Sequence, residues 1–234
     1  MKTKALVINT VKYQDKSLIV KCFTLSDGLV SFFVKDAFSA SKSSVKKAAY
    51  FQPLTLLEIE FRPKNRNTLS YFSSIKPYIY QSVATDIAKS TVILFLAEVF
   101  HSCIKDETKN EDLFLFLETA LLWLDQNDDI ADFHLILLLE MTKFLGFYPS
   151  ASKDDFFEMT DGVFVSLESK SCLSKPDSDL LKQLLGKKIN TSGKAFSNSQ
   201  RRQLLEILME YYFVHIENFR KPKSLEVLKE VFSN

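Results

Sequence analysis

Two short polar segments near the amino end carry basic side chains whose types and spacing suit phosphate binding. Three lie between residues 36 and 50 and three between residues 62 and 67, and Asp36 is the only acid in either segment. Lysine and arginine in such loops pair with the phosphates of a nucleic acid and release its counterions. The six side chains predicted to bind DNA are Lys42, Lys46, Lys47, Arg62, Lys64 and Arg66.

The distribution of charge along the chain favours this prediction. Residues 1–80 hold 13 basic and 5 acidic side chains, a net charge of +8, whereas residues 81–234 hold 17 and 24, a net charge of −7. A basic module attracts polyanions, and an acidic one does not. The alternative is that the six basic side chains only form a solvated surface, and the excess of positive charge argues against it.

Aromatic side chains close to the two basic segments can stack unpaired bases. Aromatic residues in strands are more often part of the core, so we expect these rings mainly to fill the interior of the sheet. The residues concerned are Phe38, Tyr50, Phe51, Tyr71 and Phe72.

Catalytic chemistry has little support in the sequence. The three histidines, His101, His134 and His215, lie in apolar helical segments, where a histidine is most often structural. None belongs to a recognisable motif with a serine or cysteine, and no glycine-rich phosphate loop occurs. We therefore predict that the protein is not an enzyme and needs no cofactor. A hydrolase that uses one of the histidines is the weaker alternative.

The cysteines and the amino end bear on location. Cys22, Cys103 and Cys172 are far apart and odd in number, which indicates free thiols in a reducing compartment. The amino end has no signal peptide, and the longest apolar runs, such as Thr91–Val99, are much shorter than the ~20 residues of a membrane span. We expect a cytoplasmic protein that does not enter the membrane.

The elements that position the basic loops are short strands. Apolar runs at Ala5–Val11, Ser17–Thr24 and Leu29–Val34 are separated by polar turns, the second of which is Ser-Asp-Gly, a good hairpin signal. Two more runs follow, at Pro53–Phe61 and Thr68–Ser74. Five strands with a basic excursion after the third predict an OB-fold, a partly open barrel, over residues 1–80.

The remainder, residues 81–234, is predicted to be mainly helical, so the fold class is α+β. Ile130–Leu145 has few polar positions, which places it at the centre of the helical part. Phe156–Met159 and Val163–Leu167 flank a Thr-Asp-Gly turn and predict a small β-hairpin. The helices predicted from apolar spacing are Val83–Ile104, Glu111–Asp125, Ile130–Leu145, Asp177–Leu185, Ser199–Asn218 and Ser224–Phe232.

Three stretches resemble the bacterial RecO recombination-mediator proteins. The opening ALVINTVKYQDKSLIVKCFTLSDGLVSFFVKDA resembles the first strands of that family, with its Tyr-x-(Asp/Glu)-x-(Ser/Ala) turn. LLEMTKFLGFYP at Leu138–Pro149 resembles its central helix, and KSLEVLKEVF at Lys223–Phe232 its last helix. The match thus touches both ends and the middle of the chain. Many members carry a four-cysteine zinc module where this chain has only Cys172, so we predict no metal.

The resemblance implies a mediator of DNA recombination and repair. Such a protein binds single- and double-stranded DNA, anneals complementary strands, acts with RecR, and helps to load RecA onto DNA coated by single-strand DNA-binding protein. It would bind the acidic, hydrophobic-ended tail of that coating protein on its helical part. The alternative is a non-enzymatic adaptor whose barrel binds protein rather than DNA.

A second basic segment, residues 180–205, holds no acid and can supply the cations for such a tail. It can equally extend the DNA surface or face water, and the sequence leaves these three interpretations open. The residues predicted to bind the tail are Lys182, Lys187, Lys188, Arg201 and Arg202, with Lys194 in the same segment.

Overall fold

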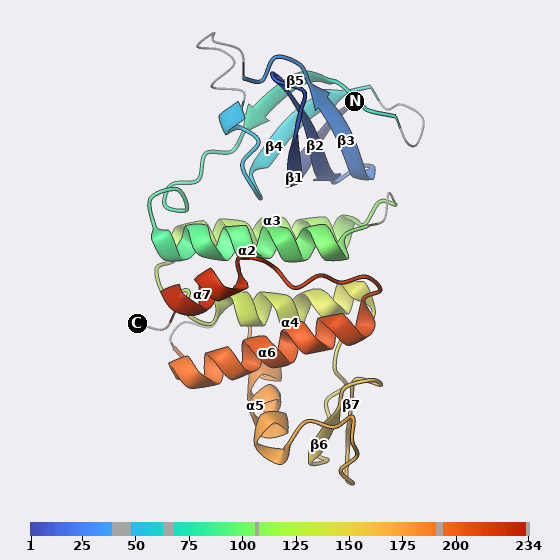
Figure 1. Cartoon of the computed structure of the whole chain (residues 1–234), viewed down its shortest axis with the longest axis vertical. Coiled ribbons are helices and arrows are strands. Elements are labelled where there is room, and N and C mark those ends of the chain that lie inside the picture. Colours follow the sequence, from blue (N-terminus) through green and yellow to red (C-terminus); the bar gives the residue numbers. More distant parts are fainter. Residues whose placement is uncertain (39–47, 63–67, 106–107, 191–193, 233–234) are drawn as a thin grey trace.

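The structure is a computed structural model that describes residues 1–38, 48–62, 68–105, 108–190 and 194–232. A β-barrel lies at one end of the long axis and a small hairpin at the other, with helices stacked between them (Figure 1). The barrel strands are β1 (Lys2–Tyr13), β2 (Ser17–Thr24), β3 (Gly28–Val34), β4 (Leu56–Phe61) and β5 (Phe72–Pro77).

The five strands form one antiparallel sheet in the order β3-β2-β1-β4-β5. Its two edges meet through Ser70, whose N–H donates to the carbonyl of Ser31 at 2.9 Å and whose carbonyl accepts from the N–H of Phe33 at 2.9 Å. This single parallel bridge leaves the barrel partly open, as in an OB-fold. The predicted fold class is confirmed.

The turns and strand ends follow local chemistry. Gly28 has a φ of 68°, and the hydroxyl of Thr24 accepts from the N–H of Asp27 at 3.0 Å, so the Ser-Asp-Gly turn forms as predicted. The fourth strand begins at Leu56 rather than at Pro53, because the N–H of Thr55 turns back to the carbonyl of Gln52. The fifth begins at Phe72 rather than at Thr68.

The helical part is confirmed, with shorter helices than predicted at several ends. Asp86 caps the first helix by accepting from the N–H of Lys89, so that helix begins four residues later than predicted. Ser197 and Gln200 form a capping box, and Gly146 ends the central helix with a φ of 87°. The elements are α2 (Ile87–Cys103), α3 (Glu111–Gln126), α4 (Phe133–Leu145), β6 (Phe156–Glu158), β7 (Val163–Val165), α5 (Lys175–Leu185), α6 (Asn198–His215) and α7 (Leu225–Val231).

The central helix α4 is buried along almost its whole length, as its composition predicted. The barrel rests on the helices through apolar side chains: Leu6, Phe23 and Leu29 belong to the same core cluster as α2 and α3, and the rings of Phe23 and Phe114 lie 5.8 Å apart. A second cluster, around Val20 and Phe32, fills the barrel itself.

The link between barrel and helices is held by one carboxylate. Asp125, at the end of α3, accepts backbone N–H groups from Gln81, Ser82 and Val83 at 2.8–3.2 Å. The buried ammonium group of Lys89 donates to the hydroxyl of Ser82 at 2.7 Å and to the carbonyl of Asp125 at 3.3 Å. These bonds fix the chain where it leaves the barrel.

Candidate nucleic-acid interface

Most of the predicted DNA-binding side chains lie outside the described residues: Lys42, Lys46, Lys47, Lys64 and Arg66. Arg62 is described and exposed, directly after the last residue of β4. Because Phe61 pairs with Phe72, Arg62 and Tyr71 stand at the two ends of the same β4–β5 connection. The structure thus places one predicted cation and one predicted aromatic ring at the same rim of the barrel.

The five predicted aromatic residues divide into two groups. Phe51 and Phe72 are packed in the barrel, with ring centroids 5.6 Å apart, and Phe72 stacks on the buried Phe32 at 4.0 Å. Tyr50 packs against the same cluster, so the expectation of a core role is confirmed for these three. It is wrong for Phe38 and Tyr71, whose side chains are about half exposed.

Tyr71 belongs to a row of three rings that the sequence analysis missed. The ring of Phe33 lies 5.9 Å from that of Tyr13 and 5.9 Å from that of Tyr71, edge-on to both, with interplanar angles of 82° and 75°. Tyr13 is 45% exposed and Tyr71 52% exposed. We call Tyr13, Phe33 and Tyr71 the aromatic row.

The register of the sheet explains why the row faces outward. Phe33 pairs with Ile19 and Ile19 with Val11, and all three point away from the barrel core, which Phe32 and Val34 fill from the alternate positions. Further along the same outer face, Leu6, Phe23 and Leu29 are covered by the helical part. One half of this face is therefore an internal contact, and the other half, which carries the aromatic row, is exposed.

Lysines border the exposed half. Lys35 follows β3 on the same side as Phe33, and Lys21 lies beyond Ile19 on β2. Lys12 reaches over the ring of Phe38, with its ammonium nitrogen 5.9 Å from the ring centroid. Residues 1–38 contain six lysines and three aspartates. Two of the aspartates, Asp15 and Asp36, are exposed near the ends of β1 and β3. An apolar row bordered by mainly positive groups suits an unpaired polyanion that carries aromatic bases.

The cations of residues 180–205 do not share one surface. Arg201 is only 6% exposed. Its guanidinium donates to the carbonyl of Phe196 at 2.5 Å and to the side-chain oxygen of Asn198. The same group lies 3.5 Å from the carboxylate of Asp132. Lys182 donates to the carbonyl of Asp154 and lies 4.8 Å from the ring centroid of Phe164.

The other cations of this segment differ in exposure. Lys187 is half-buried, whereas Lys188, Lys194 and Arg202 are exposed. Arg201 is thus part of the interior, and Lys182 fastens α5 to the segment before the hairpin.

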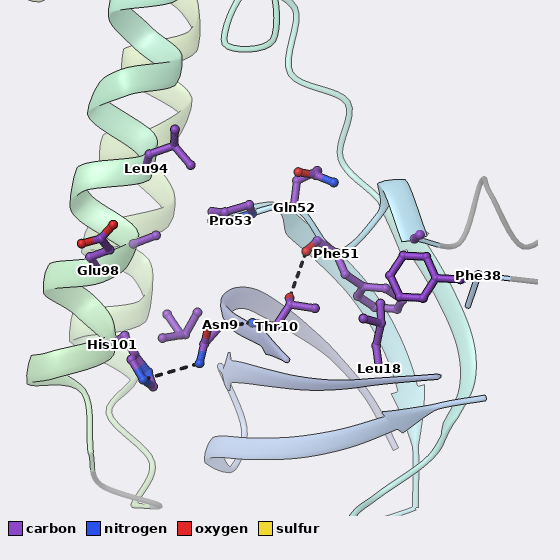
Figure 2. A pocket seen from close by; sticks show the side chains of 13 residues that line it. Asn9, Thr10, Leu18, Phe38, Phe51, Gln52, Pro53, Leu94, Glu98 and His101 are labelled. Atoms are coloured by element: carbon purple, nitrogen blue, oxygen red, sulfur yellow. Dashed lines mark hydrogen bonds between the residues drawn. The ribbon is translucent and has the colours of Figure 1, made fainter. Parts of the chain in front are cut away.

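A cavity of about 400 Å³ lies between the barrel and α2 (Figure 2). Leu94, Glu98 and His101 of α2 line one side, and Asn9 and Thr10 of β1 the other. The side-chain nitrogens of Asn9 and His101 are 3.5 Å apart, and the carboxylate of Glu98 already accepts the N–H groups of residues 223 and 224. Glu98 thus connects α2 to the segment before α7, and Asn9 and His101 bring β1 and α2 together.

His134 and His215 pack against aromatic rings, and the Cys22 and Cys103 side chains are withdrawn from solvent to different extents. Burial, with a smaller effect from Arg201, lowers the pKa of His134 to about 3, and the ring packs beside Phe95 and Phe232. His215 stacks on Phe147, and its Nε2 lies 2.9 Å from the carbonyl of Met159. Burial raises the pKa of the Cys22 and Cys103 thiols, which disfavours the reactive thiolate.

Within the described ranges, no three His, Cys, Asp or Glu side chains converge as metal ligands. Phe157 packs against Phe164 in the hairpin β6–β7 and forms two hydrogen bonds to the chain beside it. The N–H of Phe157 donates to the hydroxyl of Ser178, and its carbonyl accepts from the N–H of Leu173. In the part of the chain that the structure describes, no helix combines the length and apolar character needed to cross a bilayer.

Comparison with known proteins covers the whole chain. Residues 1–79 match the family described as Recombination protein O N terminal, and residues 84–226 match Recombination protein O C terminal. A DNA repair protein RecO from Flavobacterium johnsoniae is 54% identical over 236 residues, covering 100% of this chain and 99% of that protein. The RecO protein from Flavobacterium psychrophilum is 55% identical, over 100% of this chain and 99% of that protein. The one from Bacteroides fragilis is 35% identical, over 99% of this chain and 98% of that protein.

Proposed function

This chain belongs to the RecO family of DNA repair proteins, and from that membership we propose that it is a recombination mediator. The full-length match to relatives named as DNA repair proteins carries the proposal. In this role the protein binds single- and double-stranded DNA and anneals complementary strands. It acts with RecR and helps to load RecA onto DNA coated by single-strand DNA-binding protein, without itself being an enzyme.

The proposed mechanism is charge neutralisation by the barrel. Two DNA strands repel each other through their phosphates, and lysines and arginines reduce that repulsion while the bases find their partners. Residues 1–80, with a net charge of +8, are assigned to this task. The described cations Lys21, Lys35 and Arg62 and the predicted ones in residues 42–47 and 64–66 supply the charge.

Residues 81–234 are assigned to protein partners. The acidic tail of single-strand DNA-binding protein needs cations beside apolar surface. Lys187, Lys188 and Arg202 remain proposed for that contact. Arg201 and Lys182 bond to carbonyl groups within the molecule. The competing function is a protein-interaction adaptor, and the aromatic row is the observation that favours it, since exposed tyrosines also occur at protein interfaces.

Salt titration of DNA binding separates the two functions. We expect fluorescence anisotropy to show binding of a single-stranded oligonucleotide at low salt. The logarithm of the affinity should fall linearly with the logarithm of the salt concentration, with a slope of roughly −0.7 for each phosphate contacted. The absence of measurable affinity at low salt would favour the adaptor. RecA loading is then tested by adding the protein and RecR to coated DNA.

A further inference from the structure

The outer face of β1, β2 and β3 carries an exposed apolar strip that the charge argument does not explain. Charge neutralisation needs only cations, yet Tyr13 and Tyr71 expose about half of their surface, and Val11 beside them is also exposed. Exposed aromatic side chains in a row are uncommon on a surface that has no partner. The other half of the same face, at Phe23, buries its apolar groups against the helices, so exposure is a property of this half alone.

Resting on the proposed DNA binding, we infer that the aromatic row is a stacking platform for unpaired bases and gives the barrel a preference for single strands over duplexes. Every base has a flat π-face, so a ring platform binds single strands of any sequence. In a duplex the bases are stacked on each other and paired, and side chains on a flat sheet cannot reach their faces.

The spacing of the rings fits an extended strand. Neighbouring centroids in the row are 5.9 Å apart, whereas successive phosphates of one strand of B-form DNA are about 3.4 Å apart along the axis. Bases that pack on these rings must therefore be separated from one another. The charges fit as well, because Lys35 and Lys21 border the strip on two sides and Arg62 stands across the β4–β5 connection from Tyr71. A protein ligand would have to be acidic to match this border.

The test compares one pair of substitutions on three probes. The probes are a thymidine oligonucleotide, a duplex of the same length, and the same phosphodiester chain with abasic residues. The double variant Tyr13→Ala/Tyr71→Ala removes the two exposed rings, and Tyr13→Phe/Tyr71→Phe keeps them. Tyr78→Ala is the matched control, because Tyr78 is an exposed barrel aromatic outside the row. Thermal unfolding verifies that each variant is folded.

We expect the alanine pair to lower thymidine-oligonucleotide affinity by roughly tenfold for each ring, with duplex and abasic-chain affinities unchanged. The phenylalanine pair and Tyr78→Ala should bind like the unsubstituted protein. The inference is overturned if the unsubstituted protein binds the abasic chain as tightly as the thymidine chain, or if the alanine pair keeps full thymidine affinity. An alanine pair that retains DNA affinity but loses self-association would assign the row to a protein interface instead.

These outcomes are distinct from failure of the proposed function. If the unsubstituted protein binds none of the three probes at low salt, DNA binding itself is wrong. If it binds all three equally well and the alanine pair changes nothing, DNA binding stands and only the stacking platform is wrong.

Discussion

The barrel, residues 1–80, and the segment 180–205 are both rich in lysine and arginine. They differ in how the structure uses these side chains. In the described barrel, Lys35 and Arg62 are exposed around the aromatic row. In the helical part, Arg201 is buried beside Asp132, and Lys182 is bonded to the chain before the hairpin. A run of cations in a sequence is therefore not enough to indicate a binding surface, because buried groups such as Asp132 can hold some of them inside the molecule.

Removing Arg201 should have the largest effect on stability. Arg201→Leu leaves the carboxylate of Asp132 buried without its cation, which costs about 3–5 kcal/mol of unfolding free energy. Denaturant unfolding measures this loss, and Arg62→Leu is the matched control because its side chain is exposed. The double variant Arg201→Leu/Asp132→Leu should recover much of the loss. If Arg201→Leu alone unfolds like the unsubstituted protein, Arg201 is not the internal anchor described above.

Charge reversal in the barrel should have the next largest effect, on binding rather than on stability. Replacing Lys42, Lys46 and Lys47 with Glu should weaken single-strand affinity roughly 10- to 100-fold, or about 1.4–2.8 kcal/mol, because phosphate contacts are lost and repulsion is added. The unfolding midpoint should stay the same. The matched control reverses Lys153, Lys170 and Lys221, which are exposed on the helical part. Equal losses in both triple variants would mean that only net charge matters.

The buried His134 predicts a pH dependence that belongs to the helical part. Its pKa is lowered from 6.5 to about 3 by burial, so the unfolded chain takes up a proton before the folded one does. The protonation of His134 therefore does not change the free energy of unfolding above pH 6.5. Between pH 6.5 and 3 it lowers that free energy, by up to about 1.4 kcal/mol per pH unit. Unfolding experiments at pH 7 and pH 5 should show a smaller difference for His134→Leu than for the unsubstituted protein. An unchanged difference would contradict a neutral, buried imidazole.

The smallest effect should come from Lys182. Lys182→Ala loses a hydrogen bond to the carbonyl of Asp154 and the contact with the Phe164 ring, together about 1 kcal/mol of stability. The DNA affinity of Lys182→Ala should not change. The matched variant Lys35→Ala should bind DNA more weakly, with an unchanged free energy of unfolding. A clear loss of DNA affinity in Lys182→Ala would extend the DNA surface onto the helical part.

Local signals predicted much of the fold. The strand Ser17–Thr24 has the predicted bounds, and the Ser-Asp-Gly turn forms at Gly28, because both depend on neighbouring residues alone. The helix starts at Ile87 and Phe133 were missed. The residues before Ile87 are held by tertiary hydrogen bonds to Asp125, and those before Phe133 form a turn in which the N–H of Phe133 donates to the carbonyl of Ile130.

The candidate site was less predictable, because it depends on register. Tyr13 and Phe33 look like any strand aromatics, and only the pairing of three strands, with an irregularity between Val7 and Asn9, shows that they share the outer face. Alternation along β3 alone could have suggested that Phe32 and Phe33 face opposite ways. The burial of Arg201 depends on Asp132, which is distant in sequence and has no local signal.

Hydrogen–deuterium exchange with and without a single-stranded oligonucleotide tests most directly whether the barrel face, rather than the helical part, binds DNA. We predict that DNA slows exchange in peptides that cover residues 9–21, 29–50 and 62–76 and leaves exchange in residues 175–205 unchanged. Slower exchange confined to residues 175–205, with the barrel peptides unaffected, would contradict the assignment.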